Sequence, residues 1–153
     1  MPRGHFALVA LVIILTTAAC DNSSSSTAPT TSPATNTITL SGTVPAAVNG
    51  VPQSVSQPFS VGQLGGTVTL TLTSAVETLP GGALNSSVVM GLGVGTPSGT
   101  ACNVPAGTTA LVSASATPLT GSLNPGSYCL QVTNEDASAQ SGPVAYTVVI
   151  LTP

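Results

Sequence analysis

Apolar and polar side chains alternate along much of the chain after residue 36. In residues 67–73, Val68, Leu70 and Leu72 alternate with threonines. Successive side chains of a β-strand point to opposite faces, so this two-residue period predicts a strand with one buried face. The same period recurs at Ile38 and Leu40; Phe59 and Val61; Val88, Met90, Leu92 and Val94; Tyr128, Leu130 and Val132; and Tyr146, Val148 and Ile150. Residues 110–116 show it more weakly and predict a further strand.

Groups of proline and glycine separate these segments, as at residues 80–82, 97–99 and 125–126. Such groups mark turns. Residues 37–153 contain no long stretch with the 3.6-residue period of an amphipathic helix. About seven or eight short strands joined by turns predict an all-β fold, an antiparallel β-sandwich of the jelly-roll or immunoglobulin-like kind.

The first 20 residues have the pattern of an export signal. Arg3 precedes an apolar run at residues 6–15, and small residues lead into Cys20. The run is too short to span a membrane as a helix, which needs about 20 apolar residues. The ending Thr17-Ala18-Ala19-Cys20 resembles the lipobox of bacterial lipoproteins, although that family usually has leucine where Thr17 stands. The resemblance implies that Cys20 becomes the lipid-carrying first residue; the alternative is an ordinary signal peptide cut after Ala19.

The segment after Cys20 is rich in serine, threonine and proline and has no aliphatic residue larger than alanine up to residue 36. Such a segment cannot bury enough apolar surface to offset chain entropy, so it predicts a disordered tether. We therefore expect a signal helix at 1–19, a lipidated cysteine with its tether at 20–36, and a β-sandwich domain at 37–153. This organisation predicts an exported protein anchored to a bacterial membrane by its N-terminal lipid, in the periplasm or on the cell surface.

Charged side chains are almost absent. Arg3 is the single basic residue, His5 is the single histidine, and four acids complete the set. Cleavage before Cys20 would leave no lysine, arginine or histidine. A chain without cations cannot neutralise nucleic-acid phosphates. It also lacks a histidine base, a lysine for Schiff-base chemistry and an activator for its many serines. The sequence thus predicts a protein that is not an enzyme, binds no nucleic acid and needs no cofactor.

The acidic residues offer two weak candidate sites. Glu77 stands alone, whereas glycosidases use a carboxylate pair, so catalysis would need Glu135 or Asp136 across the fold. Asn134, Glu135 and Asp136 form a candidate calcium site, because calcium takes six to eight oxygen ligands. The alternative for these three residues is a solvated turn after the strand at 128–132.

Three cysteines fit an exported chain. If Cys20 carries lipid, Cys102 and Cys129 remain to pair in an oxidising compartment. Two thiols without an imidazole cannot supply the four ligands of a structural zinc site. We therefore predict a structural disulfide between Cys102 and Cys129.

One predicted strand has glycine at every position opposite its apolar face. These glycines are Gly91, Gly93 and Gly95. Glycine weakens a strand unless a bend or a closely approaching backbone requires the space. The pattern leaves two interpretations: a groove for a ligand or an added strand, or tight packing within the fold.

The aromatic residues after the signal are Phe59, Tyr128 and Tyr146, and each has the parity of its strand's apolar face. We interpret all three as core residues, which leaves no aromatic platform for a sugar. A sugar site built from threonine, asparagine and glutamine remains open. The Tyr128 sequence context resembles the tyrosine corner of sandwich folds, in which the hydroxyl bonds to nearby backbone.

Three segments together resemble the bacterial pre-peptidase C-terminal domain: FSV at 59–61, GGTVTL at 65–70 and LNPGSYCLQV at 123–132. The resemblance covers roughly residues 57–151 and implies a small β-sandwich of the kind appended to secreted enzymes. The family's Asp-rich turn is missing, because residues 95–100 hold no carboxylate. A calcium or substrate site of the family type is therefore not implied here, and we expect no catalytic domain beside this copy.

The sequence as a whole favours a non-catalytic, lipid-anchored envelope protein whose β-sandwich binds a partner or serves a structural role. Low charge beside strong β patterning also permits pairing through strand edges. One alternative is thus a self-assembling surface or fibre subunit. Another is a carbohydrate- or calcium-binding accessory module. The sequence does not identify a protein or glycan partner, the membrane concerned or the oligomeric state.

Overall fold

The computed structural model describes residues 35–135 and 141–153. The predicted signal, Cys20, the predicted tether and Asp136 lie outside the described residues. The described part contains ten strands: β1 (Asn36–Val44), β2 (Ser54–Val61), β3 (Gly66–Thr78), β4 (Leu84–Asn85), β5 (Val89–Ser98), β6 (Ala101–Asn103), β7 (Ala110–Ser113), β8 (Leu119–Leu123), β9 (Gly126–Thr133) and β10 (Val144–Thr152). None of the described residues forms a helix of the length and apolarity that a membrane span requires.

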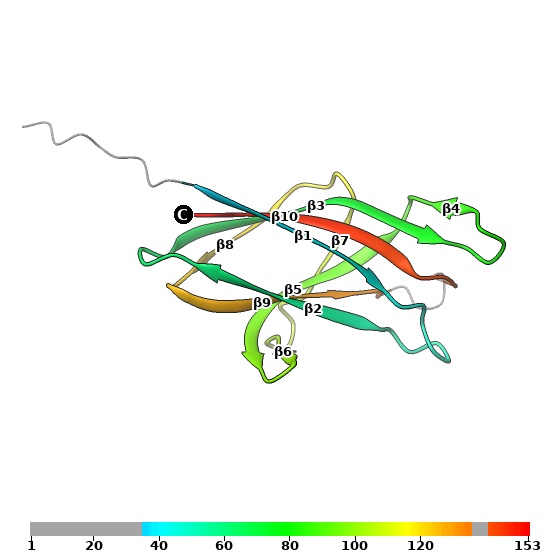
Figure 1. Ribbon diagram of the computed structural model, residues 1–153, viewed down its shortest axis with the longest axis horizontal. Helices are drawn as coiled ribbons and strands as arrows, with labels where there is room; N and C mark the ends of the chain where they lie inside the picture. The colour runs from blue at the N-terminus through cyan, green and yellow to red at the C-terminus, as the bar shows by residue number, and fades with distance from the viewer. Residues whose placement is uncertain (1–34, 136–140) are drawn as a thin grey trace, which may run out of the picture. The chain divides into compact units, whose positions relative to one another are not determined.

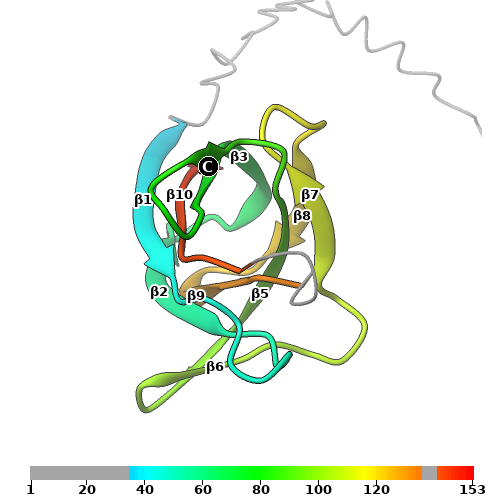
Figure 2. The ribbon, with the colours of Figure 1, turned by 90° about the vertical axis from the view of Figure 1, so that its right-hand side faces the viewer.

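The strands form two antiparallel sheets that face each other (Figure 1). The first has the order β1-β10-β3-β4, and β8 also pairs with β3. The second has the order β2-β9-β5-β6, and β7 also pairs with β5. Seen end-on, both sheets curl around a shared interior (Figure 2). The predicted all-β antiparallel sandwich is confirmed.

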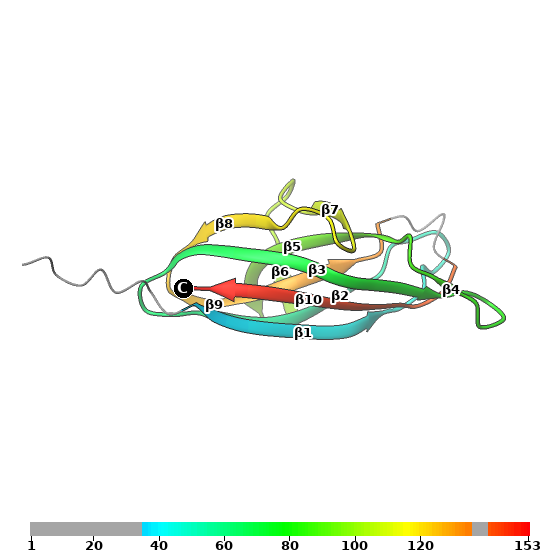
Figure 3. The same ribbon diagram turned by 90° about the horizontal axis from the view of Figure 1, so that it is seen from above.

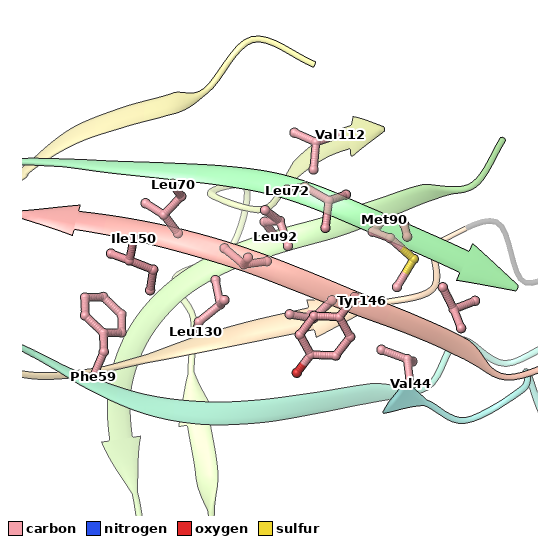
Figure 4. Packing of buried hydrophobic residues seen from close by; sticks show 14 of the residues in the cluster. Val44, Phe59, Leu70, Leu72, Met90, Leu92, Val112, Leu130, Tyr146 and Ile150 are labelled. Atoms are coloured by element: carbon pink, nitrogen blue, oxygen red, sulfur yellow. The ribbon is translucent and has the colours of Figure 1, made fainter. Parts of the chain in front are cut away.

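The alternating residues fill the space between the sheets. Val68, Leu70 and Leu72 of β3 are buried, as are Val148 and Ile150 of β10. Figure 4 shows side chains from both sheets meeting in this layer. Phe59 and Tyr146 belong to the core as predicted, whereas Tyr128 is half-buried and packs against the core's edge. Valine and leucine make up most of this core, and they pack well between two sheets that lie face to face.

A bulge changes the parity of β3 halfway along its length. Leu72 pairs with Val148 and Ser74 pairs with Thr147, which leaves Thr73 as the extra residue. The Thr73 hydroxyl donates a hydrogen bond to the Thr147 carbonyl at 3.1 Å. An extra residue in one strand reverses which face the following side chains reach. Ala75 and Glu77 therefore point inward beyond the bulge, and both are fully buried.

The sequence pattern missed three short strands, β4, β6 and β8. In β8, Leu119 and Leu123 face the core, and the intervening Thr-Gly-Ser residues carry little apolar signal. The strands β4 and β6 have two and three residues, too few to establish a period. The weak prediction at residues 110–116 corresponds to the shorter β7. Short edge strands are recognised by their partners rather than by their own sequence, which explains these misses.

Gln57 joins the two sheets along the side where β1 and β2 meet. Its Nε2 donates to the Ser41 carbonyl of β1 at 2.8 Å and to the Tyr146 hydroxyl of β10 at 2.9 Å. Gly42 leaves room for that hydroxyl, because a Cβ there would lie 2.8 Å from the Tyr146 oxygen. This side of the sandwich is thus closed by a buried phenol and an amide.

Burial raises the pKa of the Tyr146 phenol above 10.0, and the hydrogen bond from Gln57 opposes this effect. The folded chain therefore holds the phenol proton more tightly than the unfolded chain does. The resulting stability is fully present below about pH 10 and is lost as the pH rises through the folded-state pKa. We expect urea unfolding, followed by circular dichroism, to show lower stability at about pH 11 than at about pH 8. Tyr146→Phe should flatten this fall and Tyr128→Phe should retain it; an equal fall in both variants would contradict the assignment.

Candidate functional site

The predicted disulfide is present. Cys102 and Cys129 are bonded with an S–S distance of 2.02 Å and a Cα–Cα distance of 5.8 Å. The bond attaches β6 to the central strand β9 of the second sheet. Because β6 itself pairs with β5, the disulfide fixes the start of the segment that crosses back towards β7.

That crossing segment covers the glycine face of β5. A Cβ on Gly95 would overlap the Asn103 carbonyl oxygen, and one on Gly93 would lie 2.7 Å from a Val104 methyl group. A Cβ on Gly91 would lie 2.7 Å from Cγ of Glu135. The glycines therefore allow close packing, by backbone over Gly95 and by side chains over Gly91 and Gly93. Of the two interpretations of this strand, the structure supports packing.

Glu77 is a buried structural carboxylate. Its Oε1 accepts a hydrogen bond from the Gly142 backbone N–H at 2.9 Å, and its Oε2 accepts one from Asn85 Nδ2 at 3.1 Å. Gly142 fits against the strand because a Cβ there would overlap the Thr78 carbonyl oxygen. Both carboxylate oxygens thus bind groups of the fold, and the side chain is fully buried. These contacts give no support to a catalytic pair formed with Glu135.

Asn134 also has a structural role. Its Oδ1 accepts a hydrogen bond from the Gln53 N–H at 2.5 Å, and its Nδ2 donates one to the Pro45 carbonyl at 3.0 Å. The fully buried amide therefore ties the loop between β1 and β2 to the end of β9. Glu135 is exposed. The described residues contain no group of three or more His, Cys, Asp or Glu side chains arranged for a metal ion. Calcium binding by Glu135 and Asp136 stays a prediction.

Tyr128 has the contacts of a tyrosine corner. Its hydroxyl donates to the Asn124 carbonyl, four residues earlier, at 3.0 Å. Its ring stacks on Phe59, the residue directly opposite on β2, with ring centroids 5.8 Å apart. The hydrogen bond holds the turn before β9 against the sandwich. Both the hydroxyl and the ring of Tyr128 contact other parts of the fold, so the ring is not a free platform for a sugar.

A crevice opens between the two sheets on the side opposite β1. Figure 3 shows β7 and β8 along this long side and β1 along the other. The Ser115 N–H, just after β7, donates to the Leu72 carbonyl of β3 at 3.1 Å. A cavity of about 290 Å³ on this side reaches inward to the core residues. Its lining comes from β3, β5, β7, β8 and the loop before β7: Val68, Leu70, Leu92, Val94, Thr108, Ala110, Leu119, Thr120, Gly121 and Leu123.

The chemistry of the crevice is uncharged and amphipathic. Aliphatic side chains form its interior, and Thr108 and Thr120 supply the hydroxyl groups in the lining. The Thr108 hydroxyl donates to the Pro105 carbonyl at 2.7 Å, so this side chain offers an oxygen as an acceptor. Neither a carboxylate nor a basic group lines the space. An apolar pocket with a few polar groups is the usual form of a small-molecule site.

Gly121 is the residue that keeps the crevice open. It lies directly opposite Val68 in the pairing of β8 with β3, so a side chain at this position would point to the same inner face. A Cβ on Gly121 meets no atom within 4 Å. A second hollow of about 270 Å³ shares Val94 and Leu123 with the crevice and continues past Pro105 to Tyr128. Sequence reasoning missed this site because its residues come from three separate regions of the chain, at 68–70, 92–94 and 108–123.

Comparison with known proteins adds little to this description. No protein-family model matches the chain, and no curated protein matches it. Among solved structures, a family two carbohydrate esterase from Cellvibrio japonicus is similar, with a TM-score of 0.32 and 12% sequence identity. The match covers 78% of this chain and 34% of that one, so the chain spans about a third of the esterase's length.

Proposed function

We propose that the chain is a non-catalytic, lipid-anchored module of the bacterial envelope that binds an uncharged amphiphile in the crevice between β8 and β7. The observation that carries this proposal is the crevice itself, a space of about 290 Å³ with aliphatic walls, threonine hydroxyls and no charged lining residue. An alkyl or acyl group would enter the interior, and the hydroxylated remainder of the ligand would contact Thr108 and Thr120.

Three observations support anchoring and export. Cys20 ends a segment that resembles a lipobox, and a serine-, threonine- and proline-rich segment separates it from β1. The disulfide between Cys102 and Cys129 is of the kind that persists in oxidising compartments. Together they support a domain that lies outside the cytoplasm and is joined to a membrane by its N-terminal lipid.

The placement of the acidic groups supports a non-catalytic role. Glu77 is buried and bound on both oxygens, and Glu135 packs beside Gly91. No lysine, arginine or histidine follows residue 5 in the sequence, so serine and threonine hydroxyls have no basic side chain to activate them. Ligand binding needs neither a basic side chain nor a carboxylate pair. Serine-based acyl transfer needs the base, and glycoside hydrolysis needs the carboxylate pair.

Octyl glucoside below its micelle concentration tests the proposed site, with glucose as the headgroup control. We expect octyl glucoside to raise the melting temperature in a saturable way and glucose to leave it unchanged. Gly121→Leu places a side chain in the crevice and should abolish the shift. Ser122→Leu is the matched control, because Ser122 pairs with Thr67 on the outer face and should retain the shift.

The proposal fails if Gly121→Leu binds octyl glucoside as well as the original chain does. It also fails if glucose alone gives the same shift, since the aliphatic walls would then contribute nothing. A shift lost equally in Ser122→Leu would show that β8 as a whole, rather than the crevice, affects the measurement.

Assembly through strand edges remains an alternative. The outer edge strand β1 has nine residues without a charge or a proline, a combination that favours pairing with another chain. Gln57 already occupies the Ser41 carbonyl on this edge, and the neighbouring edge strand β2 contains Pro58. Sedimentation of the detergent-solubilised chain at decreasing concentration distinguishes the two: a monomer throughout excludes assembly, and a stable oligomer favours it.

A further inference from the structure

The start of β1, the turn between β2 and β3, and the C-terminus meet at one end of the sandwich. Asn36, the first residue of β1, pairs with Thr152 of β10. A Cβ on Gly66, at the start of β3, would lie 2.9 Å from the Pro153 ring. Figure 1 shows β1 beginning beside the C-terminus. The described part of the chain therefore begins and ends at this end of the sandwich.

The same end presents an apolar side chain to solvent. Leu64 is 85% exposed, a larger fraction than for any other large apolar residue that the structure describes. It lies in a closed turn, because the Gly65 N–H donates to the Gly62 carbonyl at 3.0 Å and Gly65 adopts a positive φ of 59°. A neighbouring hollow of about 460 Å³ is lined by Thr35, Leu64, Gly65, Gly66, Thr67, Thr69, Leu151, Thr152 and Pro153, with no charged side chain among them.

The described carboxylates lie at the opposite end. Glu77 pairs with Asn85 of β4, and Glu135 follows the end of β9 that pairs with the start of β2. The 13 residues of β3 separate Leu64 from the β4 end, a length of about 40 Å at the usual rise per residue. A negatively charged lipid surface would therefore meet no acidic side chain of the described residues at the Leu64 end, and would repel the carboxylates at the other.

We propose that the Leu64 end rests on the bilayer and that Leu64 inserts into the lipid interface. The inference rests on the proposed lipid at Cys20. If the 15 residues between Cys20 and Asn36 form the predicted flexible tether, its end-to-end distance would be about 20 Å. One leucine binds a membrane weakly, but a lipid tether of that length supplies a high effective concentration at the surface. Contact follows from the tether combined with an exposed apolar side chain and the absence of charged side chains among the described residues around it.

The sequence contains no tryptophan, so one introduced tryptophan is a single fluorescent reporter. Leu64→Trp is the test variant. Leu84→Trp is the matched control, because Leu84 is also a highly exposed leucine, at 71%, but lies at the β4 end. Each full-length lipidated chain is reconstituted into phosphatidylcholine vesicles with or without bromine on the acyl chains. We expect the tryptophan fluorescence of the Leu64→Trp chain to fall by about half in brominated vesicles, as for an interfacial side chain, and that of the Leu84→Trp chain to stay unchanged.

Vesicle flotation in the same samples separates the two ways of failing. Chains that float with vesicles but show no quenching at position 64 overturn the membrane contact and leave the anchor intact. Equal quenching at both positions also overturns it, because the contact would not be specific to one end. Chains that do not float refute the anchor and the inference together. Hydrogen exchange on the original sequence supplies a readout without tryptophan: vesicle attachment should protect residues 62–66 and leave residues 79–85 unchanged.

Discussion

Gly95→Ala is expected to lower the free energy of unfolding by about 3 kcal/mol, at the upper end of the cost of forcing extra atoms into a packed region. The new Cβ would overlap the Asn103 carbonyl oxygen and lie 2.6 Å from its carbon. These atoms are backbone, so no side-chain rotation relieves the contact. The neighbouring Cys102 is also bonded to Cys129, the residue opposite Gly95, and this restricts movement of the covering segment. Chemical unfolding of the purified chain measures the effect.

Gly121→Ala is the matched control. It adds the same methyl group to another strand glycine, but its Cβ meets no atom within 4 Å. We expect its free energy of unfolding to change by less than about 1 kcal/mol. The change is a gain if alanine mainly restricts the unfolded chain. Equal costs for the two substitutions would contradict the packing role assigned to the glycine face of β5.

Removing the disulfide by the double substitution Cys102→Ser and Cys129→Ser is expected to cost about 3–4 kcal/mol on the chain-entropy account of a closed loop. The two cysteines are 27 residues apart, and the loop between them includes β7 and β8, which border the crevice. Freeing this loop should therefore also weaken binding of octyl glucoside. Unfolding by urea and the thermal shift measured with the same variant test both effects.

The two predictions are coupled through the segment that leaves β6. Once the disulfide is absent, Asn103 can move away from β5, and Gly95→Ala should then cost less than it does in the bonded chain. A double-mutant cycle measures this interaction directly. Costs that simply add would show that the disulfide does not hold the covering segment in place.

The periodic part of the fold could be predicted from the sequence, and a single bulge marks where that prediction ends. Val68, Leu70 and Leu72 identify the inner face of β3 before the bulge. After Thr73 the inner face passes to Ala75 and Glu77, which an uninterrupted alternation assigns to the outside. Bulges depend on the partner strand, so the sequence of β3 alone did not reveal that Glu77 is buried. The inward-facing positions shift from Leu72 to Ala75, and this shift can be recognised only when the pairing of β3 with β10 is known.

The candidate sites show the same division between local and distant information. The disulfide and the tyrosine corner depend on residue type and short-range context, and both are present as predicted. The crevice depends on how far β7 and β8 stand apart, which is a property of the assembled sheets. The role of Asn134 likewise depends on Pro45 and Gln53 across the β1–β2 loop. Neither arrangement has a signature in a single segment.

The central proposal is that the disulfide-bonded domain is exported and anchored by a lipid on Cys20. Intact mass spectrometry of the protein from the membrane fraction, before and after reduction, tests it most directly. The account predicts a mass equal to residues 20–153 plus acyl groups on Cys20, and a gain of about 2 Da on reduction of one disulfide. A soluble, unacylated chain beginning at Cys20, or free Cys102 and Cys129 thiols in the freshly isolated protein, would contradict it.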